Sequence, residues 1–210
     1  MKEYQNLSKK DLQLIKKLNS PKKIQDFINN LEMNFDYIND TCQSPKQVLK
    51  NKKAHCIEGA ILAAAILRYH GYKPLLLDLE AAKKDYDHVV ALFKHHGHWG
   101  AISKTNHSVL RYREPIYKTI RELALSYFHE YFLNENGKKT LRKYSNPVNL
   151  KIFDNLNWIS TDNEVWFIPE HLVKIKHIPI LNRKQIANLR NADNIEIKAG
   201  EILEYPEPKS

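Results

Sequence analysis

Residues 51–70 read Asn-Lys-Lys-Ala-His-Cys-Ile-Glu-Gly-Ala-Ile-Leu-Ala-Ala-Ala-Ile-Leu-Arg-Tyr-His, and this stretch decides the fold. From Cys56 to His70 it holds fair to good helix formers without a proline, and Gly71 follows, as a left-handed helix end requires. The helix is apolar almost all round, which is typical of a helix buried in a core or in a membrane. The apolar run 60–67 is far shorter than the ~20 residues that a membrane span needs. We therefore predict the buried central helix of a globular domain.

The position of Cys56 in the first turn of this helix has chemical consequences. Unpaired N–H groups and the helix dipole place partial positive charge there, which favours the thiolate, the nucleophilic form of cysteine. Free cysteine is also a common small core residue, so the position alone does not establish catalysis. The rest of the chain has to supply a base for this thiol.

Length and composition indicate one large domain, or one domain with an appendage. The chain has 210 residues, and its hydrophobic content of 42% is enough for a substantial core. The N-terminus is polar and lacks an apolar segment, so we expect no signal peptide. No stretch qualifies as a transmembrane helix, so we expect no membrane partner. Two cysteines, Cys42 and Cys56, do not make a disulfide framework, and we expect a cytoplasmic location.

The formal net charge of +9 comes from 33 basic and 24 acidic residues. Such a balance is compatible with a nucleic acid or another anionic partner. The lysines, however, are spread in pairs along the chain, and no RNA- or DNA-binding motif accompanies them. We interpret them as solvated helix faces and do not expect nucleic acid to bind. The sequence gives no indication of the oligomeric state.

Serine–proline pairs at 20–21 and 44–45 mark helix starts, because serine caps a helix and proline fits its first position. Besides the central helix, helices are predicted at 8–19, 21–31, 45–49, 115–132 and 184–189. Strands are predicted at 73–80, 87–94, 99–104, 108–112, 148–153 and 164–168. We interpret residues 1–135 as a catalytic core and residues 136–210 as an extension packed on it, with a single domain as the alternative.

A nucleophilic cysteine needs a base, and the base needs an orienting group. His88 is the best candidate among ten histidines, because it begins a predicted strand of aliphatic residues 32 positions after Cys56. A metal site at His95, His96 and His98 is the rival use of histidine. Three histidines at one hairpin tip are more often exposed turn residues, because tight metal sites need convergent ligands from separate elements. We therefore expect no metal and no other cofactor.

Three segments follow one another in a characteristic order. They are Ala54-His-Cys-Ile-Glu-Gly-Ala60, Asp87-His-Val-Val-Ala-Leu-Phe93 and Gly97-His-Trp-Gly-Ala-Ile-Ser-Lys-Thr105. Together they resemble the transglutaminase-like superfamily of cysteine enzymes, which is similar to papain in its fold logic, over roughly residues 20–110. The resemblance implies an α+β fold with N-terminal helices, a buried central helix starting at the catalytic cysteine, and an antiparallel sheet. It implies Cys56 as nucleophile and His88 as base.

The third member of the family's catalytic set differs here. The family typically has aspartate four residues after the tryptophan, and this sequence has Ser103 four residues after Trp99. Ser103 can accept a hydrogen bond from an imidazole N–H, and Asn106 could do the same. Both are neutral, so either would stabilise a thiolate–imidazolium pair less than a carboxylate does.

Hairpin geometry predicts which of these side chains faces the histidine. If His96-Gly97 forms a two-residue turn, pairing proceeds outward from the residues on either side of it. His88 then lies opposite Thr105, with Ser103 one diagonal step away on the same face of the sheet. Ser103 is therefore within reach of the imidazole.

An oxyanion hole needs N–H donors beside the nucleophile. The Cys56 backbone N–H is one, and the Gln43 side chain is a candidate for another. Trp99 and Arg113 are candidates for lining the substrate cleft, although a solvent-facing ion pair explains Arg113 equally well.

We expect a cysteine-dependent hydrolase or acyltransferase that acts on an amide or peptide bond through a thioester intermediate. Its partner is then a peptide or another amide-containing substrate. The alternative, motivated by the neutral third member and the basic charge, is a catalytically inactive transglutaminase-like domain that binds an anionic partner, either nucleic acid or an acidic protein. That alternative predicts an unreactive Cys56 and salt-dependent binding.

Overall fold

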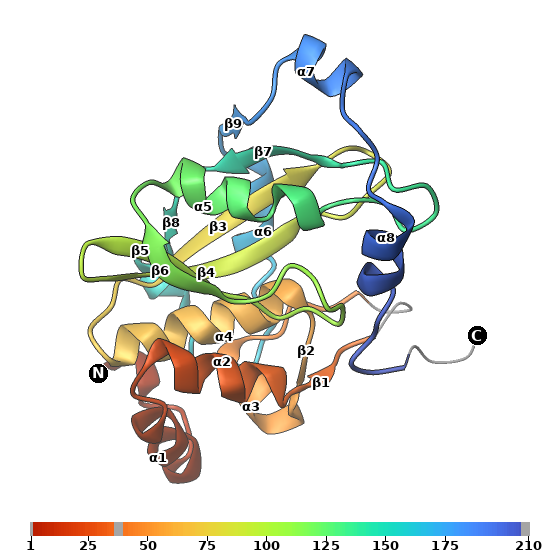
Figure 1. Ribbon diagram of the computed structural model, residues 1–210. Coiled ribbons are helices and arrows are strands. Elements are labelled where there is room, and N and C mark those ends of the chain that lie inside the picture. Colours follow the sequence, from red (N-terminus) through yellow and green to blue (C-terminus); the bar gives the residue numbers. More distant parts are fainter. Residues whose placement is uncertain (1, 36–39, 207–210) are drawn as a thin grey trace.

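The computed structural model describes residues 2–35 and 40–206, which fold into helices and mostly antiparallel strands joined by loops (Figure 1). The helices, with 3-10 helices written η, are η1 (Lys2–Tyr4), α1 (Lys9–Lys17), α2 (Pro21–Asn29), α3 (Pro45–Asn51), α4 (Cys56–Tyr69), α5 (Ile120–Ser126), η2 (Phe128–Glu130), η3 (Leu150–Leu156), α6 (Phe167–Lys174), α7 (Arg183–Ala187) and α8 (Asn194–Gly200). The strands are β1 (Glu32–Met33), β2 (Lys53–Ala54), β3 (Leu75–Ala81), β4 (His88–His95), β5 (His98–Ile102), β6 (Arg113–Tyr117), β7 (Leu141–Ser145), β8 (Val148–Asn149) and β9 (His177–Pro179). This α+β arrangement confirms the predicted fold class.

The central helix α4 is buried, as its composition predicts. Every residue from Glu58 to Leu67 is buried, with α1, α2 and α3 packed on one side and β4 on the other. Gly71 has a φ of +87°, and the Tyr72 N–H donates to the Leu67 carbonyl at 3.0 Å, which closes the helix as a glycine end predicts. Within the described residues, no helix is long and apolar enough to cross a membrane.

The main sheet has the strand order β6-β5-β4-β3-β7-β9, with β8 also paired to β3, and all its pairs are antiparallel. The β4–β5 hairpin has the predicted two-residue turn. His96 and Gly97 have φ values of +46° and +82°, the left-handed pair that matches the twist of a tight hairpin. His95 pairs with His98, and the ladder continues from there in the predicted register. β1 and β2 form a separate two-stranded parallel sheet.

Two hydrophobic cores lie on the two faces of the main sheet. Side chains alternate along a strand, so Leu76 and Val89 face α1–α4 while Leu77 and Val90 face the α5 side. Figure 1 shows α4 beneath the sheet and α5 above it. The helix α4 therefore covers one face of the sheet, and α5 covers the other.

The expectations for residues 108–132 were wrong in two respects. The strand predicted at 108–112 lies instead at β6, and the helix predicted from Pro115 begins at Ile120. Pro115 lies within β6, which tolerates it because an edge strand can do without one ladder N–H. The helix starts after Thr119, whose side chain accepts the Glu122 N–H.

The strands predicted beyond Gly137 also need correction. The strand expected at 148–153 is confined to β8 and is followed by η3. No strand forms at 164–168, and helix α6 begins within this range. Ile168 and Leu172, four residues apart, face the core from α6. Short apolar runs do not distinguish strand from helix by periodicity. No element was predicted for β7, whose sequence Leu-Arg-Lys-Tyr-Ser is mostly polar. The helix predicted at 184–189 is confirmed, within two residues, as α7.

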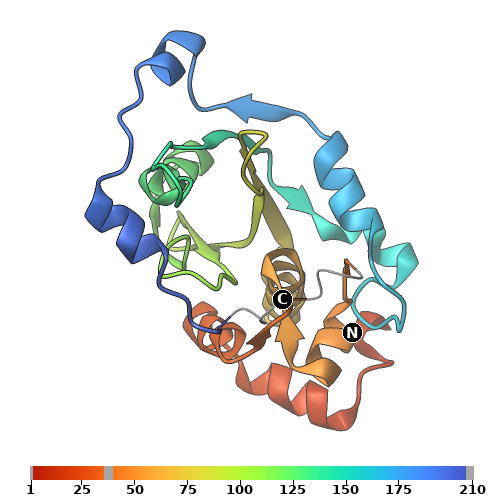
Figure 2. The same ribbon diagram turned by 90° about the vertical axis from the view of Figure 1, so that its right-hand side faces the viewer.

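The C-terminal part of the chain extends the main sheet and then returns to its starting end. A buried contact of 2.9 Å between Asp78 of β3 and His177 of β9 joins the two regions. From β9 the chain runs around the outside of the sheet through α7 and α8 toward the N-terminal helices (Figure 2). The division at residue 135 remains a prediction, with strands from both sides of it lying in one sheet.

Gly59 of α4 allows this helix to approach the segment that follows β5. A Cβ at position 59 would lie 2.5 Å from the Lys104 Cβ. Alanine is favoured over glycine within helices by about 1 kcal/mol, but overpacking costs about 1–3 kcal/mol. We expect Gly59→Ala to lower the free energy of unfolding, measured by urea denaturation. A variant as stable as the wild type or more stable would contradict this close packing.

Candidate active site

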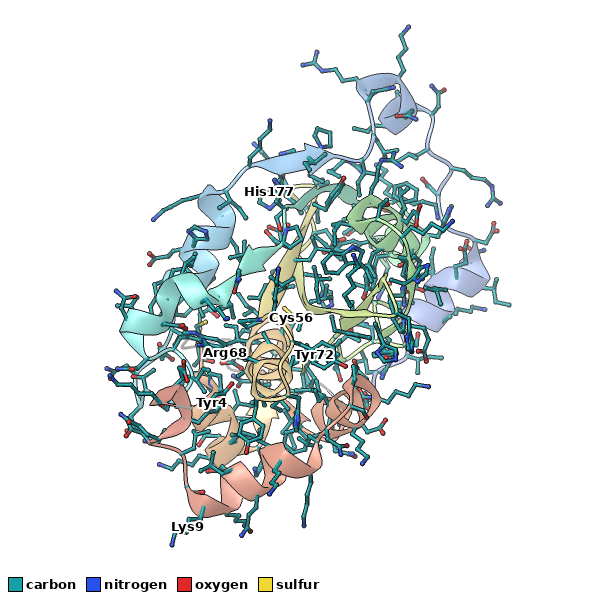
Figure 3. The ribbon with its side chains drawn as sticks, turned by 90° about the vertical axis from the view of Figure 1, so that its left-hand side faces the viewer. Tyr4, Lys9, Cys56, Arg68, Tyr72 and His177 are labelled. Carbon is teal, nitrogen blue, oxygen red and sulfur yellow. The ribbon has the colours of Figure 1, made fainter. Side chains whose placement is uncertain are left out.

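Three elements bring the predicted catalytic residues together. Cys56 is the first residue of α4, His88 is the first residue of β4, and Ser103 directly follows β5. Figure 3 shows Cys56 where α4 meets the strands of the sheet. The thiol-bearing residue is half-buried, whereas Cys42 is fully buried, so Cys56 is the cysteine that a substrate can reach.

The His88 imidazole is oriented by Ser103, as the hairpin register predicts. His88 Nε2 lies 2.8 Å from the Ser103 hydroxyl oxygen. That hydroxyl donates its proton to the Leu110 carbonyl at 2.6 Å, because a carbonyl can only accept. Ser103 must therefore accept from His88 Nε2–H. This fixes the tautomer of the neutral ring and leaves Nδ1 free to take a proton.

The Ser103 backbone is itself held from α2. The buried Gln25 side chain donates to the Ser103 carbonyl at 2.8 Å and accepts the Ser103 N–H at 2.9 Å. Leu110, which accepts from Ser103, has a φ of +59°, an uncommon value for leucine, and its N–H donates to Glu130 at 2.8 Å. Ser103 therefore has a defined position, because Gln25 holds its backbone at two points and the constrained Leu110 carbonyl accepts from its hydroxyl.

A second histidine contacts the thiol. The side chain of His55, which directly precedes α4, hydrogen-bonds to Cys56. Its Nε2 lies 2.7 Å from the Thr41 carbonyl and 3.5 Å from a carboxylate oxygen of Glu58. Cys56 therefore lies between two imidazoles, one from the helix start and one from β4.

Glu58 is the buried centre of a hydrogen-bond network around this helix start. Its carboxylate accepts from the Gln43 N–H at 2.8 Å, the Thr41 hydroxyl at 2.9 Å, the His55 N–H at 3.0 Å and the Asn34 amide at 3.1 Å. Its side chain is fully buried. The network ties the segment before α3 to the first turn of α4 and holds His55 beside the thiol.

The environment of Cys56 favours the thiolate. Burial by itself raises the pKa of this thiol, but hydrogen bonds from His55 and His88 and their charges lower it to about 5. Burial likewise opposes charge on His55, whereas its hydrogen bond to Cys56 and the charges of Cys56 and Glu58 raise its pKa to about 9. Between these two values the site holds a thiolate beside a protonated His55.

Cys56 and His88 line a cleft of about 320 Å³. Apolar side chains from distant parts of the chain contribute to its walls, among them Met33, Phe35, Tyr131, Phe132 and Leu133. Pockets of this size accept small ligands or single side chains of a larger substrate. Cys56 therefore borders a space large enough for a small ligand.

A family model described as a transglutaminase-like domain matches residues 3–110, which is 108 of the 210 residues. The chain belongs to the transglutaminase-like domain family. The matched range includes Cys56, His88 and Ser103 and ends before β6. A search of curated proteins found no match for this chain.

Asn106 of this transglutaminase-like domain lies in the cleft wall but does not contact His88 through any described hydrogen bond. Its side chain donates to the Tyr205 carbonyl at 2.9 Å and accepts the Tyr205 N–H at 2.9 Å. The same C-terminal segment pairs with the backbone at Ser108, whose N–H donates to the Ile202 carbonyl at 3.1 Å. Asn106 thus anchors the returning C-terminus, and Ser103 is the predicted residue that meets the imidazole.

The structure places Gln43, Trp99 and Arg113 outside the lining of the cleft. The Gln43 side-chain amide donates to the Lys53 carbonyl and to Glu58, so it belongs to the Glu58 network. The Trp99 ring packs under the Lys94 ammonium, 5.1 Å away. Arg113 pairs with Glu130 at 2.7 Å, and its guanidinium stacks on a buried tyrosine ring. Its side chain is only 12% exposed, so this is not the solvent-facing pair that the alternative described.

Sequence reasoning missed His55, Glu58 and Gln25. A signal for the first two was present, because Glu58 follows His55 by three residues, the spacing at which a carboxylate caps the start of a helix. No sequence signal links Gln25 to Ser103, since the contact spans 78 residues.

The tip of the β4–β5 hairpin carries His95, His96 and His98, the histidines of the rival metal-site interpretation. His95 and His96 are exposed, and His98 Nδ1 contacts the His96 carbonyl at 3.0 Å. In the part of the chain that the structure describes, no three or more His, Cys, Asp or Glu side chains are grouped to hold a metal ion.

Proposed function

We propose that this transglutaminase-like domain is a cysteine-dependent enzyme that acts on an amide or peptide bond through a thioester. Cys56 is the nucleophile, His88 is the general base and acid, and Ser103 orients His88. The observation that carries the proposal is that half-buried Cys56, at a helix N-terminus, lines one cleft together with His88, whose Nε2 is fixed by Ser103.

In the acylation step, the Cys56 sulfur bonds to the carbonyl carbon of the substrate and the carbonyl electron pair moves to oxygen. The Cys56 backbone N–H faces this oxygen as one of the helix N–H groups without an intrahelical acceptor. When the carbonyl re-forms, the carbon–nitrogen bond breaks, and the amine leaves with the proton that His88 Nδ1 took from the Cys56 thiol before the attack. The product is a thioester on Cys56.

In the deacylation step, His88 Nδ1 removes a proton from a water molecule, whose oxygen attacks the thioester carbon. The carbon–sulfur bond breaks and the thiolate is restored beside the protonated imidazole. An amine in place of water would give acyl transfer. We favour hydrolysis, because water needs no second binding site.

The pH dependence of Cys56 alkylation tests the activated thiol. With its pKa near 5, Cys56 is already a thiolate at pH 6, so its iodoacetamide labelling rate should change less than about twofold from pH 6 to 8. The rate should fall as the pH drops below about 5, because the thiolate takes up a proton there. An ordinary thiol, with a pKa near 8.5, would instead gain about tenfold per pH unit over the same range. Intact mass after timed quenching gives both rates.

The matched control for this experiment is Cys42→Ala, which should leave the profile unchanged. Burial raises the pKa of Cys42 far above its usual value, so it should not be labelled in the folded protein. His88→Ala should move the midpoint upward, because it removes one hydrogen bond that favours the thiolate. A wild-type midpoint at 8.5 or above would overturn the enzyme proposal and favour the inactive binding module for an anionic partner.

A further inference from the structure

We propose that two histidines serve Cys56 with separate tasks: His55 holds the thiolate as a fixed imidazolium, and His88 alone moves the proton. This inference rests on the proposed cysteine chemistry and adds a residue to it. It follows from how differently the two rings are anchored around one sulfur.

The protonation of His55 follows from its partners. Its Nε2 faces the Thr41 carbonyl at 2.7 Å, and a carbonyl can only accept, so Nε2 carries a proton. Nδ1 is the nitrogen left for the hydrogen bond to Cys56. When the sulfur is a thiolate, Nδ1 must donate, and the ring then carries both protons and a positive charge.

The charge on His55 has a buried counter-charge. The Glu58 carboxylate lies 3.5 Å from His55 Nε2 and is fully buried. An opposite charge at this distance favours the protonated imidazole. Ser103 contacts His88 where the catalytic histidine of this family typically has a carboxylate partner, but a carboxylate is present beside the second histidine.

His88 has no such charge partner on its outer nitrogen. Its Nε2 donates to the neutral Ser103 hydroxyl, which can orient the ring but cannot hold a charge on it as strongly as a carboxylate does. A ring that must give and take a proton within one catalytic cycle benefits from this, because neither protonation state is locked. The neutral Ser103 is therefore a suitable partner for His88, provided that His55 is the residue that stabilises the thiolate.

Other ionisable groups around the thiol either disfavour its ionised form or interact with other partners. Asp78 of β3 interacts unfavourably with a charged Cys56, as does Tyr131 from the far wall of the cleft. Asp87, beside His88, also lines the cleft and adds negative charge. Lys104 lines it too, but its ammonium donates to the Leu31 carbonyl and lies over the Tyr205 ring. His55 and His88 are thus the groups that favour a thiolate at Cys56.

The experiment compares His55→Gln with His88→Gln in the full-length protein, with His98→Gln as a histidine control at the hairpin tip. One readout is the midpoint pH of Cys56 alkylation by iodoacetamide. The other uses p-nitrophenyl acetate, which acetylates the thiol with release of p-nitrophenolate. The burst of p-nitrophenolate reports acylation, and loss of the acetyl mass from the protein reports deacylation by water.

We expect His55→Gln to raise the alkylation midpoint by about 1–3 pH units, the effect of removing a nearby opposite charge. Once the pH exceeds the new midpoint, its deacylation rate should lie within about threefold of wild type, since the proton-transfer residue is intact. His88→Gln should slow deacylation by about 10²-fold or more at every pH, the usual scale of general-base catalysis. His98→Gln should change neither readout.

An unchanged midpoint in a folded His55→Gln protein would overturn the inference while leaving the proposed function standing. Slow deacylation in His55→Gln at high pH would also overturn it, because His55 would then be a proton-transfer residue. A wild-type Cys56 that labels only as an ordinary thiol would remove both the inference and the function under it. Glu58→Gln provides a second variant if His55→Gln does not fold, and it should raise the midpoint in the same direction.

Discussion

Replacing Cys56 with alanine is expected to abolish acylation and turnover, with a loss of at least about four orders of magnitude. Among the described side chains that line the cleft, Cys56 is the one thiol. It lies at a helix N-terminus, and two imidazoles interact with it. Without sulfur, no thioester can form, and the p-nitrophenyl acetate burst should disappear completely. The burst amplitude per protein molecule, measured by stopped-flow absorbance, checks this.

The fold should survive this substitution. Cys56 is half-buried at the first position of α4, and the capping of that helix comes from the Glu58 carboxylate, which remains. The urea midpoint should therefore stay close to that of the wild type. Cys42→Ala should keep the full burst, and a burst that survives in Cys56→Ala would assign the acylation to another residue.

Replacing Glu58 with leucine is expected to destabilise the protein by about 3–5 kcal/mol, the cost of breaking a buried charged network by removing one partner. The change would leave the N–H groups of Gln43 and His55 without their acceptor, together with the Thr41 hydroxyl and the Asn34 amide. Each is buried or half-buried, so water replaces the lost partner poorly. Urea denaturation with an unchanged m-value measures the loss directly.

Glu58→Gln is the matched comparison, because its amide oxygen can still accept while its N–H₂ group cannot. We expect an intermediate loss of stability, with the protein still folded at 25 °C. A Glu58→Leu protein within about 1 kcal/mol of the wild type would mean that these donors find other partners. The network would then not be what holds His55 in place.

Much of the fold is decided by local features of the sequence. The apolar stretch after Cys56 can only be satisfied in a core, and Gly71 ends it because glycine adopts a left-handed conformation without strain. The turn at His96-Gly97 sets the register of β4 and β5, and register alone brings Ser103 within reach of His88. These parts were predictable because each depends on residues close together in the chain.

The remaining elements depend on burial by distant partners. Pro115 is compatible with a helix start and with an edge strand, and its place in β6 beside β5 selected the strand. The run 164–168 is apolar enough for either structure, and packing of Ile168 and Leu172 against the core selected a helix. Local preference is a weak guide wherever tertiary contacts can satisfy two alternatives.

By itself, the sequence determined the central helix, the thiol at its first turn, and the hairpin that brings Ser103 within reach of His88. Only the tertiary structure decided that Gln25 hydrogen-bonds to the Ser103 backbone and that Asn106 binds the returning C-terminal segment. It also decided that a carboxylate network holds His55 beside the thiol. The physical reason is the range of the interactions. Helix caps and tight turns act over a few residues, whereas buried polar groups take whichever partners the completed fold brings to them.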